Sequence, residues 1–173
     1  GFKNLDGGGD TGFQKQDYLG KIRFSTRSDV RVHQALALKV GYTDEISDET
    51  YLGLTDADYA ASPRRRYAAS RRDQMDAEHW QVVLRHVVRP FENIDLTTTA
   101  YRTDFSRNWY KLDAVRAAED AATAGIGEIV ASPEDFGPEI AILEGATSSN
   151  DNALLVKANN RSYYSRGIQS VLG

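Results

Sequence analysis

TTTAYRTDFSRNWYKLD, residues 97–113, alternates threonines with apolar or aromatic residues and then gathers rings and cations within a few positions. A period of two predicts a β-strand, because successive side chains of a strand point to opposite faces. Phe105, Trp109 and Tyr110 collect at one tip of this strand. A soluble sandwich leaves one face of a strand to water and has no reason to collect rings there. The pattern therefore indicates a solvent other than water.

The same period recurs along the chain, with Tyr18, Ile22 and Phe24 on one face and Lys21 and Arg23 on the other. Some of these stretches are separated by polar breaks of hairpin length, and others by much longer segments without strand character. We predict strands near 18–26, 30–43, 77–88, 94–106 and 154–172, with long loops at 44–76 and 113–152. The fold class that follows is mainly β, an antiparallel up-and-down meander whose long loops carry short helices.

Capping residues predict helices in the first long loop. Thr55 followed by Asp58 is an N-cap pattern. Ser62 before Pro63 places a cap residue just ahead of a favoured first helical position. We therefore expect two short helices there.

The second long loop is rich in Ala, Glu and Gly, and it carries similar signals. Asp113 predicts a helix that continues to about Thr123. A further helix is expected to open at Ser132 and to stop at Gly145, since glycine favours the left-handed conformation that ends many helices.

Composition excludes several classes of protein. Of 173 residues, 40% are hydrophobic and 27% charged, and the net charge of −4 argues against wholesale nucleic-acid binding. Cysteine is absent, which removes disulfides and thiolate metal sites. No apolar run reaches the length of a transmembrane helix. The start, GFKNLDGGGDTGF, has neither signal-peptide features nor an initiator Met, so we expect a mature product or an excised piece.

Long and short connections alternate, which in an antiparallel meander places all short turns at one end and all long loops at the other. Outer-membrane barrels have this asymmetry, and in them lipid-facing residues alternate with residues that face a polar lumen. For the strand near 94–106, the expected lumen set is Asp95, Thr97, Thr99 and Tyr101, and the expected lipid set is Ile94, Leu96 and Ala100.

Aromatic residues collect where a membrane meets water, because Tyr and Trp have an apolar body and a polar tip. Five residues near the long-loop ends of the expected strands fit such a girdle. These membrane-interface anchors are Tyr42, Trp109, Tyr110, Tyr163 and Tyr164.

Three stretches carry a family resemblance: DETYLGLTDADYAASPRRRYAASRRDQMDAEH, LTTTAYRTDFSRNWYKLD and ANNRSYYSRGIQ. Together they resemble the middle of the β-barrel of TonB-dependent outer-membrane receptors of the ferric citrate or iron-chelate type. The resemblance covers the chain from about Gly7 to the C-terminus. Residues 1–173 are accordingly expected to form one partial barrel domain.

The resemblance implies a segment of a 22-stranded barrel that is closed by an N-terminal plug. It also implies import of a ferric siderophore or other iron chelate across the outer membrane of a Gram-negative bacterium, with energy delivered by TonB through the plug. With about five strands and no plug, this chain is not expected to transport anything by itself. Outer-membrane lipid and lipopolysaccharide are further implied partners.

The densest positive patch is Arg64, Arg65 and Arg66, next to Tyr67. In an extracellular loop, guanidinium groups could hold an anionic ferric chelate or a lipopolysaccharide phosphate. Rings and cations near the tip of the fourth strand extend the candidate ligand-binding set. That set is Arg64, Arg65, Arg66, Tyr67, Arg102, Trp109 and Tyr110. The alternative is a solvated loop in which the arginines pair with Asp56, Asp58 and Asp73.

Catalysis and metal binding find little support. Asp44, Glu45, Asp48 and Glu49 lack the glycine and the ligand spacing of a calcium-binding EF-hand loop. His79 and His86 are seven positions apart and point to opposite strand faces. Neither a nucleophile elbow nor a phosphate loop is present. We expect no enzyme activity, no metal and no cofactor.

A second hypothesis is a soluble β-rich ligand-binding or adhesion module. It predicts that Tyr18, Val32, Leu84 and Ile94 converge on a dry core, whereas the barrel hypothesis predicts that they face outward. An enzyme with its site in the loops is a third and weaker possibility. Unpaired end strands and an apolar face predict that an isolated segment self-associates.

Overall fold

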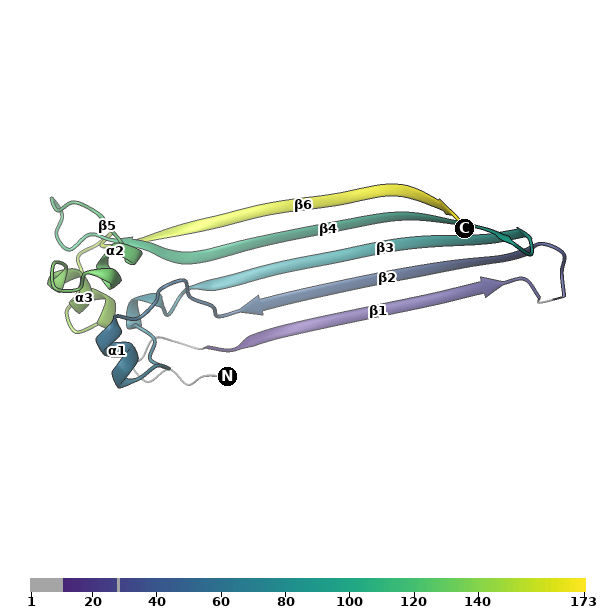
Figure 1. Cartoon of the computed structure of the whole chain (residues 1–173). Helices are drawn as coiled ribbons and strands as arrows, with labels where there is room; N and C mark the ends of the chain where they lie inside the picture. The colour runs from purple at the N-terminus through teal and green to yellow at the C-terminus, as the bar shows by residue number, and fades with distance from the viewer. Residues whose placement is uncertain (1–10, 28) are drawn as a thin grey trace. The chain divides into compact units, whose positions relative to one another are not determined.

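A computed structural model describes residues 11–27 and 29–173 (Figure 1). This part of the chain is mainly β. The strands are β1 (Phe13–Ser25), β2 (His33–Ser47), β3 (Gln74–Phe91), β4 (Ile94–Val115), β5 (Ala124–Gly125) and β6 (Leu154–Leu172). The helices are α1 (Asp56–Ala61), the 3-10 helix η1 (Ala68–Ser70), α2 (Ile126–Ala131) and α3 (Gly137–Glu144).

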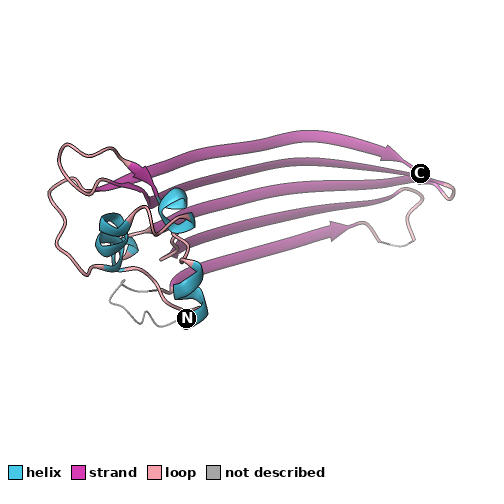
Figure 2. Cartoon of the chain, turned by 60° about the vertical axis from the view of Figure 1, so that its left-hand side comes forward, coloured by secondary structure: helices cyan, strands magenta, loops and turns pink. Residues whose placement is uncertain are grey.

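The strands form one six-stranded antiparallel sheet in the order β1-β2-β3-β4-β5, with β6 also pairing with β4. Consecutive long strands are therefore neighbours, as Figure 2 shows in magenta. The predicted mainly β meander with few helices is confirmed.

Two compact units divide the chain. The strand unit consists of Lys15–Glu45, Ala77–Arg107 and Arg161–Gly173. The loop unit consists of residues 11–14, Ile46–Asp76 and Asn108–Asn160. Each unit has its own chemistry and is described by itself.

The strand unit has two different faces. Phe24, Leu36 and Leu84 line a groove on one face, which we call the apolar face. Lys39 and Arg85 line a groove on the other face, which we call the polar face. Odd and even positions separate as the period of two predicted.

Apolar side chains of the strand unit remain exposed. Ile22, Leu38, Leu84 and Leu96 are exposed by 36% to 50%. On the polar face, by contrast, Ala35 is only 4% exposed. A dry interior around the apolar residues, as the soluble-module hypothesis predicted, is not seen in the described residues.

Side-chain and backbone bonds fix the strand register. At one end of β1 the Lys15 ammonium lies 3.1 Å from Glu45, and at the other end Thr26 N donates to Gln34 O. Both pairs give the same register of β1 on β2, so neither strand has an inserted residue between the two pairs. Between β4 and β6, Asp95 and Gly173 exchange two backbone hydrogen bonds.

Four of the five predicted strands are longer in the structure, β6 has the predicted bounds, and the helix expected after Asp113 is wrong. β4 continues to Val115, so Asp113 lies within a strand, with Lys157 Nζ 3.9 Å from its carboxylate. β5 pairs with β4 through Ala114 and Gly125, which gives the extended backbone a partner there. Residues 116–123 form no helix.

Helix boundaries agree with the sequence only in part. Thr55 does cap α1, accepting a hydrogen bond from Asp58 N. Ser62 ends that helix rather than starting another. Similarly, Ser132 is the C-cap of α2, and α3 begins at Gly137. Ser62 and Ser132 donate backbone hydrogen bonds at the C-terminal ends of α1 and α2. The local sequence did not distinguish a serine at the start of a helix from one at its end.

Gly145 ends α3 as predicted, and its φ of 75° lies in the left-handed region. An added Cβ would lie 3.0 Å from Ala68 Cβ. We expect Gly145→Ala to destabilise α3 by about 1 kcal/mol or more, because strain and crowding add together. Hydrogen exchange of the α3 amides measures the loss.

Gly127→Ala is the matched control, since a Cβ there meets nothing within 4 Å and the residue lies in helix α2. Alanine at this position should leave the stability of α2 unchanged or raise it by up to about 1 kcal/mol. Equal exchange rates in wild type and Gly145→Ala would contradict the strain argument.

Candidate ligand-binding surface of the loop unit

The two long loops share one hydrophobic core. Tyr67 from the first loop and Ile129 and Leu143 from the second are at most 1% exposed. Leu112 and Val115 of β4 complete the fully buried set. Burial of this apolar surface makes the two loops one folded unit, although they are far apart in the sequence.

A buried polar pair reinforces this core. Arg66 is 6% exposed and donates hydrogen bonds to Asp48 O at 2.7 Å and Ser70 O at 2.6 Å. Asp73 is 3% exposed and accepts from Thr50 Oγ1 at 2.7 Å and from Leu112 N at 2.8 Å. Burial lowers the pKa of Arg66 from its ordinary value. Burial also raises the pKa of Asp73, against the effect of these hydrogen bonds.

Asp58 is the centre of a second network. Its carboxylate accepts hydrogen bonds from the Tyr67 hydroxyl, from Arg65 and from Thr55 Oγ1. Burial raises its pKa, but the hydrogen bonds from Tyr67 and Thr55 and the Arg65 charge outweigh burial, so the pKa is lowered overall. Arg65 also donates to Glu144 Oε1 at 3.0 Å and thereby joins the first loop to α3.

The predicted ligand-binding residues therefore lie in different surroundings. Arg65, Arg66 and Tyr67 bond within the loop unit, and the alternative pairing of Arg65 with Asp58 is present. Arg64 is exposed. Arg102 belongs to the strand unit, where it pairs with Asp104 at 2.9 Å.

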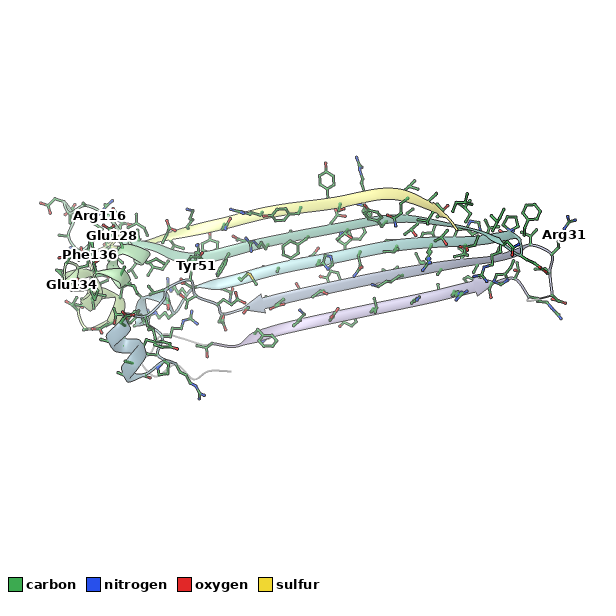
Figure 3. The ribbon with its side chains drawn as sticks, viewed as in Figure 1. Arg31, Tyr51, Arg116, Glu128, Glu134 and Phe136 are labelled. Atoms are coloured by element: carbon green, nitrogen blue, oxygen red, sulfur yellow. The ribbon has the colours of Figure 1, made fainter. Side chains whose placement is uncertain are left out.

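A different group of loop-unit residues offers an accessible recognition surface, which we call the Tyr51 site. The Tyr51 ring meets the Trp109 ring edge-on, with centroids 5.3 Å apart. Lys111 Nζ lies 3.6 Å from the Tyr51 ring centroid and 5.5 Å from that of Trp109. Tyr51, labelled in Figure 3, is 61% exposed. A cation is thus held between two rings at a surface.

Trp109 adds a hydrogen-bond donor that has no partner. Its Nε1 atom is buried, and nothing in residues 11–27 or 29–173 accepts its proton. A buried unsatisfied N–H costs free energy. Because this N–H is not exposed, the Tyr51 site presents the Lys111 ammonium and the exposed Tyr51 ring to an anionic ligand.

The sequence predicted part of this site. Trp109 was expected there, and Lys111 lies two positions further along β4, so the period of two places both on one face. Tyr51 was missed, because nothing in its local sequence links it to β4. Tyr110 is 51% exposed, as an anchor or a ligand contact would be.

The predicted anchors divide between faces. Tyr163 stacks on Phe105, with centroids 6.1 Å apart, and Phe105 lines a groove with Thr43 and His79 at odd positions of the polar face. Tyr163 therefore lies on the polar face of the strand unit. Tyr164 follows it on the opposite side and is 74% exposed.

Among the described residues, no three His, Cys, Asp or Glu side chains are placed to hold a metal ion. Glu45, from the acidic group considered above, pairs with Lys15 instead. No helix in the same residues is long and apolar enough to cross a membrane.

Comparison of the chain with protein-family models, with curated proteins and with solved structures found no match.

The lowered pKa of Asp58 predicts acid lability of the loop unit. Because the folded-state pKa lies below the ordinary 3.8, the stabilisation is present above about pH 4 and is lost as pH falls through the folded value. Asp58→Asn should remove this part of the pH dependence. Hydrogen exchange of the Tyr67 amide at pH 2 to 5 measures it.

Asp56→Asn is the control, since Asp56 is exposed in the same helical turn. Asp56→Asn should show the same change of hydrogen-exchange protection with pH as the wild type. Asp73, whose raised pKa acts in the opposite direction, is present in both variants and cancels in their comparison. If protection changes with pH in the same way in Asp58→Asn and in the wild type, the role assigned to Asp58 is contradicted.

Proposed function

We propose that this chain is part of the wall of an outer-membrane β-barrel of the TonB-dependent receptor type. The observation that carries the proposal is the two-faced sheet of the strand unit, with large apolar side chains exposed on one face and most of its lysine and arginine side chains on the other. In water such an apolar face is costly. In lipid it is the face that a barrel strand presents.

The extent of the apolar face agrees with a bilayer. Its alternate positions run over nine residues from Trp80 to Val88 in β3, with His86 among them, and over nine from Tyr164 to Leu172 in β6, with Arg166 and Ser170 among them. Roughly 9 to 11 residues of tilted strand cross the hydrocarbon of a membrane. Both stretches therefore have the length that a barrel wall needs.

Rings mark one edge of this face. The shared β1–β2 alignment sets Tyr18 opposite Tyr42. The Gln81 side chain covers Gly41, so the adjacent Tyr42 and Trp80 are also neighbours. With Tyr164 these residues form a row suited to the interface between lipid and water. They replace Tyr163 in the girdle that the sequence predicted.

The charged residues near this row have the placement expected at an interface. The Arg102 guanidinium lies 5.1 Å from the Trp80 ring centroid and pairs with Asp104. That of Arg166 lies 5.8 Å from the Tyr164 ring centroid. Long cationic side chains can reach toward water while their stems lie against apolar surface.

Within such a receptor the loop unit would capture ligand. The Tyr51 site offers the Lys111 cation and an exposed aromatic ring to an anionic ferric siderophore or other iron chelate. Exposed Arg64 could add charge. TonB, acting through a plug elsewhere in the receptor, would supply energy, and lipopolysaccharide would surround the wall in a Gram-negative outer membrane. The function is binding and transport, without catalysis or a cofactor.

Cysteine scanning tests the wall proposal, because the chain has no cysteine of its own. Leu38→Cys and Leu84→Cys place labels on the apolar face, and Ala37→Cys and Val83→Cys place them on the polar face of the same strands. We expect a lipid-borne quencher to reduce the fluorescence of the first pair and aqueous iodide that of the second, in vesicles. Equal iodide quenching at all four positions, or protection of all four from both quenchers, would favour a soluble module.

Ferric chelate binding tests the ligand separately. In a Trp80→Phe background, Trp109 is the only tryptophan and its fluorescence reports on the Tyr51 site. Titration with ferric citrate should quench it, and Lys111→Ala should weaken binding roughly tenfold, as loss of a charged contact does.

Lys157→Ala is the matched control, since Lys157 is an exposed cation of the loop unit whose nearest carboxylate, Asp113, is 3.9 Å away. It should leave the affinity unchanged. If ferric citrate binds neither the Trp80→Phe protein nor its Lys157→Ala variant, the ligand proposal is contradicted. The wall proposal is unaffected by that result.

A further inference from the structure

The polar face of the strand unit contains a groove of about 400 Å³ with an unusual concentration of positive charge. Its charged lining consists of Lys21, Arg23, Lys39, Arg85 and Arg89, with Asp95 as the one carboxylate. The whole chain is acidic, with a net charge of −4. Positive charge is therefore gathered here rather than spread over the surface.

Strand pairing brings two of these cations directly opposite each other. The β1–β2 alignment that sets Lys15 beside Glu45 and Thr26 beside Gln34 also sets Lys21 across from Lys39. Like charges at directly opposite positions destabilise an antiparallel pair. The sheet therefore bears an electrostatic cost at this position.

No neighbouring carboxylate relieves this cost. Lys15, on the same strand as Lys21, pairs with Glu45. In the described part of the chain, none of the five cationic groove side chains has a hydrogen bond or an ion pair. Their donors are all available to an anion from outside.

Small residues give the groove its depth. Ala35 and Ala37 line it, and the strand alignments place Ala37 between the longer side chains of Arg23 and Arg85. Ala35 is only 4% exposed. The volume is in the range of small-molecule sites, about 300 to 1,000 Å³, and is too confined for a groove that follows a polymer.

We propose that this groove binds a small polyvalent oxyanion, of the polyphosphate or polycarboxylate class. Several negative charges on one small molecule match five cations around a short floor, and guanidinium groups bind phosphate and carboxylate oxygens in pairs. The site is separate from the Tyr51 site, and the proposal goes beyond iron-chelate capture.

Calorimetric titration of the full chain with inorganic tripolyphosphate, and separately with citrate, tests the proposal. Wild type should bind at least one of them saturably, with an affinity that falls as salt rises. Lys39→Gln and Arg85→Gln should each weaken binding roughly tenfold or more, the loss typical of a charged hydrogen bond. Lys39→Arg, which keeps the charge, should retain most of the affinity.

Lys15→Gln is the matched control, because Lys15 lies on the same strand and is bound to Glu45 instead of the groove. It should change the affinity by less than about twofold, as expected for an exposed pair. Tighter binding of tripolyphosphate would indicate a phosphate ligand, and tighter binding of citrate a carboxylate ligand.

Three results would overturn the proposal. The first is the absence of saturable binding of either anion at millimolar concentration. The second is equal weakening by Lys15→Gln and Lys39→Gln, which would mean only a diffuse effect of charge. The third is much tighter binding of a poly-glutamate peptide, which would indicate an acidic protein partner.

Discussion

Alternation of side chains across a hydrogen-bonded sheet is the constraint on which the strand unit depends. Because the period is two, a slip of one residue in any strand would move its apolar side chains to the polar face. The β1–β2 alignment is the same at Lys15 and at Thr26, which holds Ile22 and Lys21 on opposite sides. Two glycines help, since Gly41 lies under Gln81 and Gly167 under Tyr101, where a Cβ would collide.

The two units are stabilised in different ways. The loop unit has a conventional apolar core around Tyr67, Ile129 and Leu143, with Arg66 and Asp73 satisfied inside it. In the strand unit, Ala35 is the one buried hydrophobic residue among those described. Its backbone pairing is extensive, but many of its larger apolar side chains in the described residues are exposed, among them Leu38, Leu84 and Ile168. A surrounding apolar medium would supply what the protein does not.

Charge is sorted as well as hydrophobicity. On the apolar face, Arg102 and Arg166 lie beside rings at the aromatic row. On the polar face, Lys39 and Arg85 border a groove whose only carboxylate among the described lining residues is Asp95. Arg102 and Arg166 on the apolar face thus contact aromatic rings of the protein. Lys39 and Arg85 on the polar face can bind solutes instead.

The sequence by itself determined the strands, the assignment of residues to faces, the cap at Thr55 and the helix end at Gly145. These features depend on neighbours within a few positions, so local pattern is sufficient for them. Only the tertiary structure decided that Arg66 is buried, that Tyr51 lies on Trp109, and that Lys21 and Lys39 face one another. Each of these depends on which distant segments pair or pack together, and hydrophobic burial has no direction that a local pattern records.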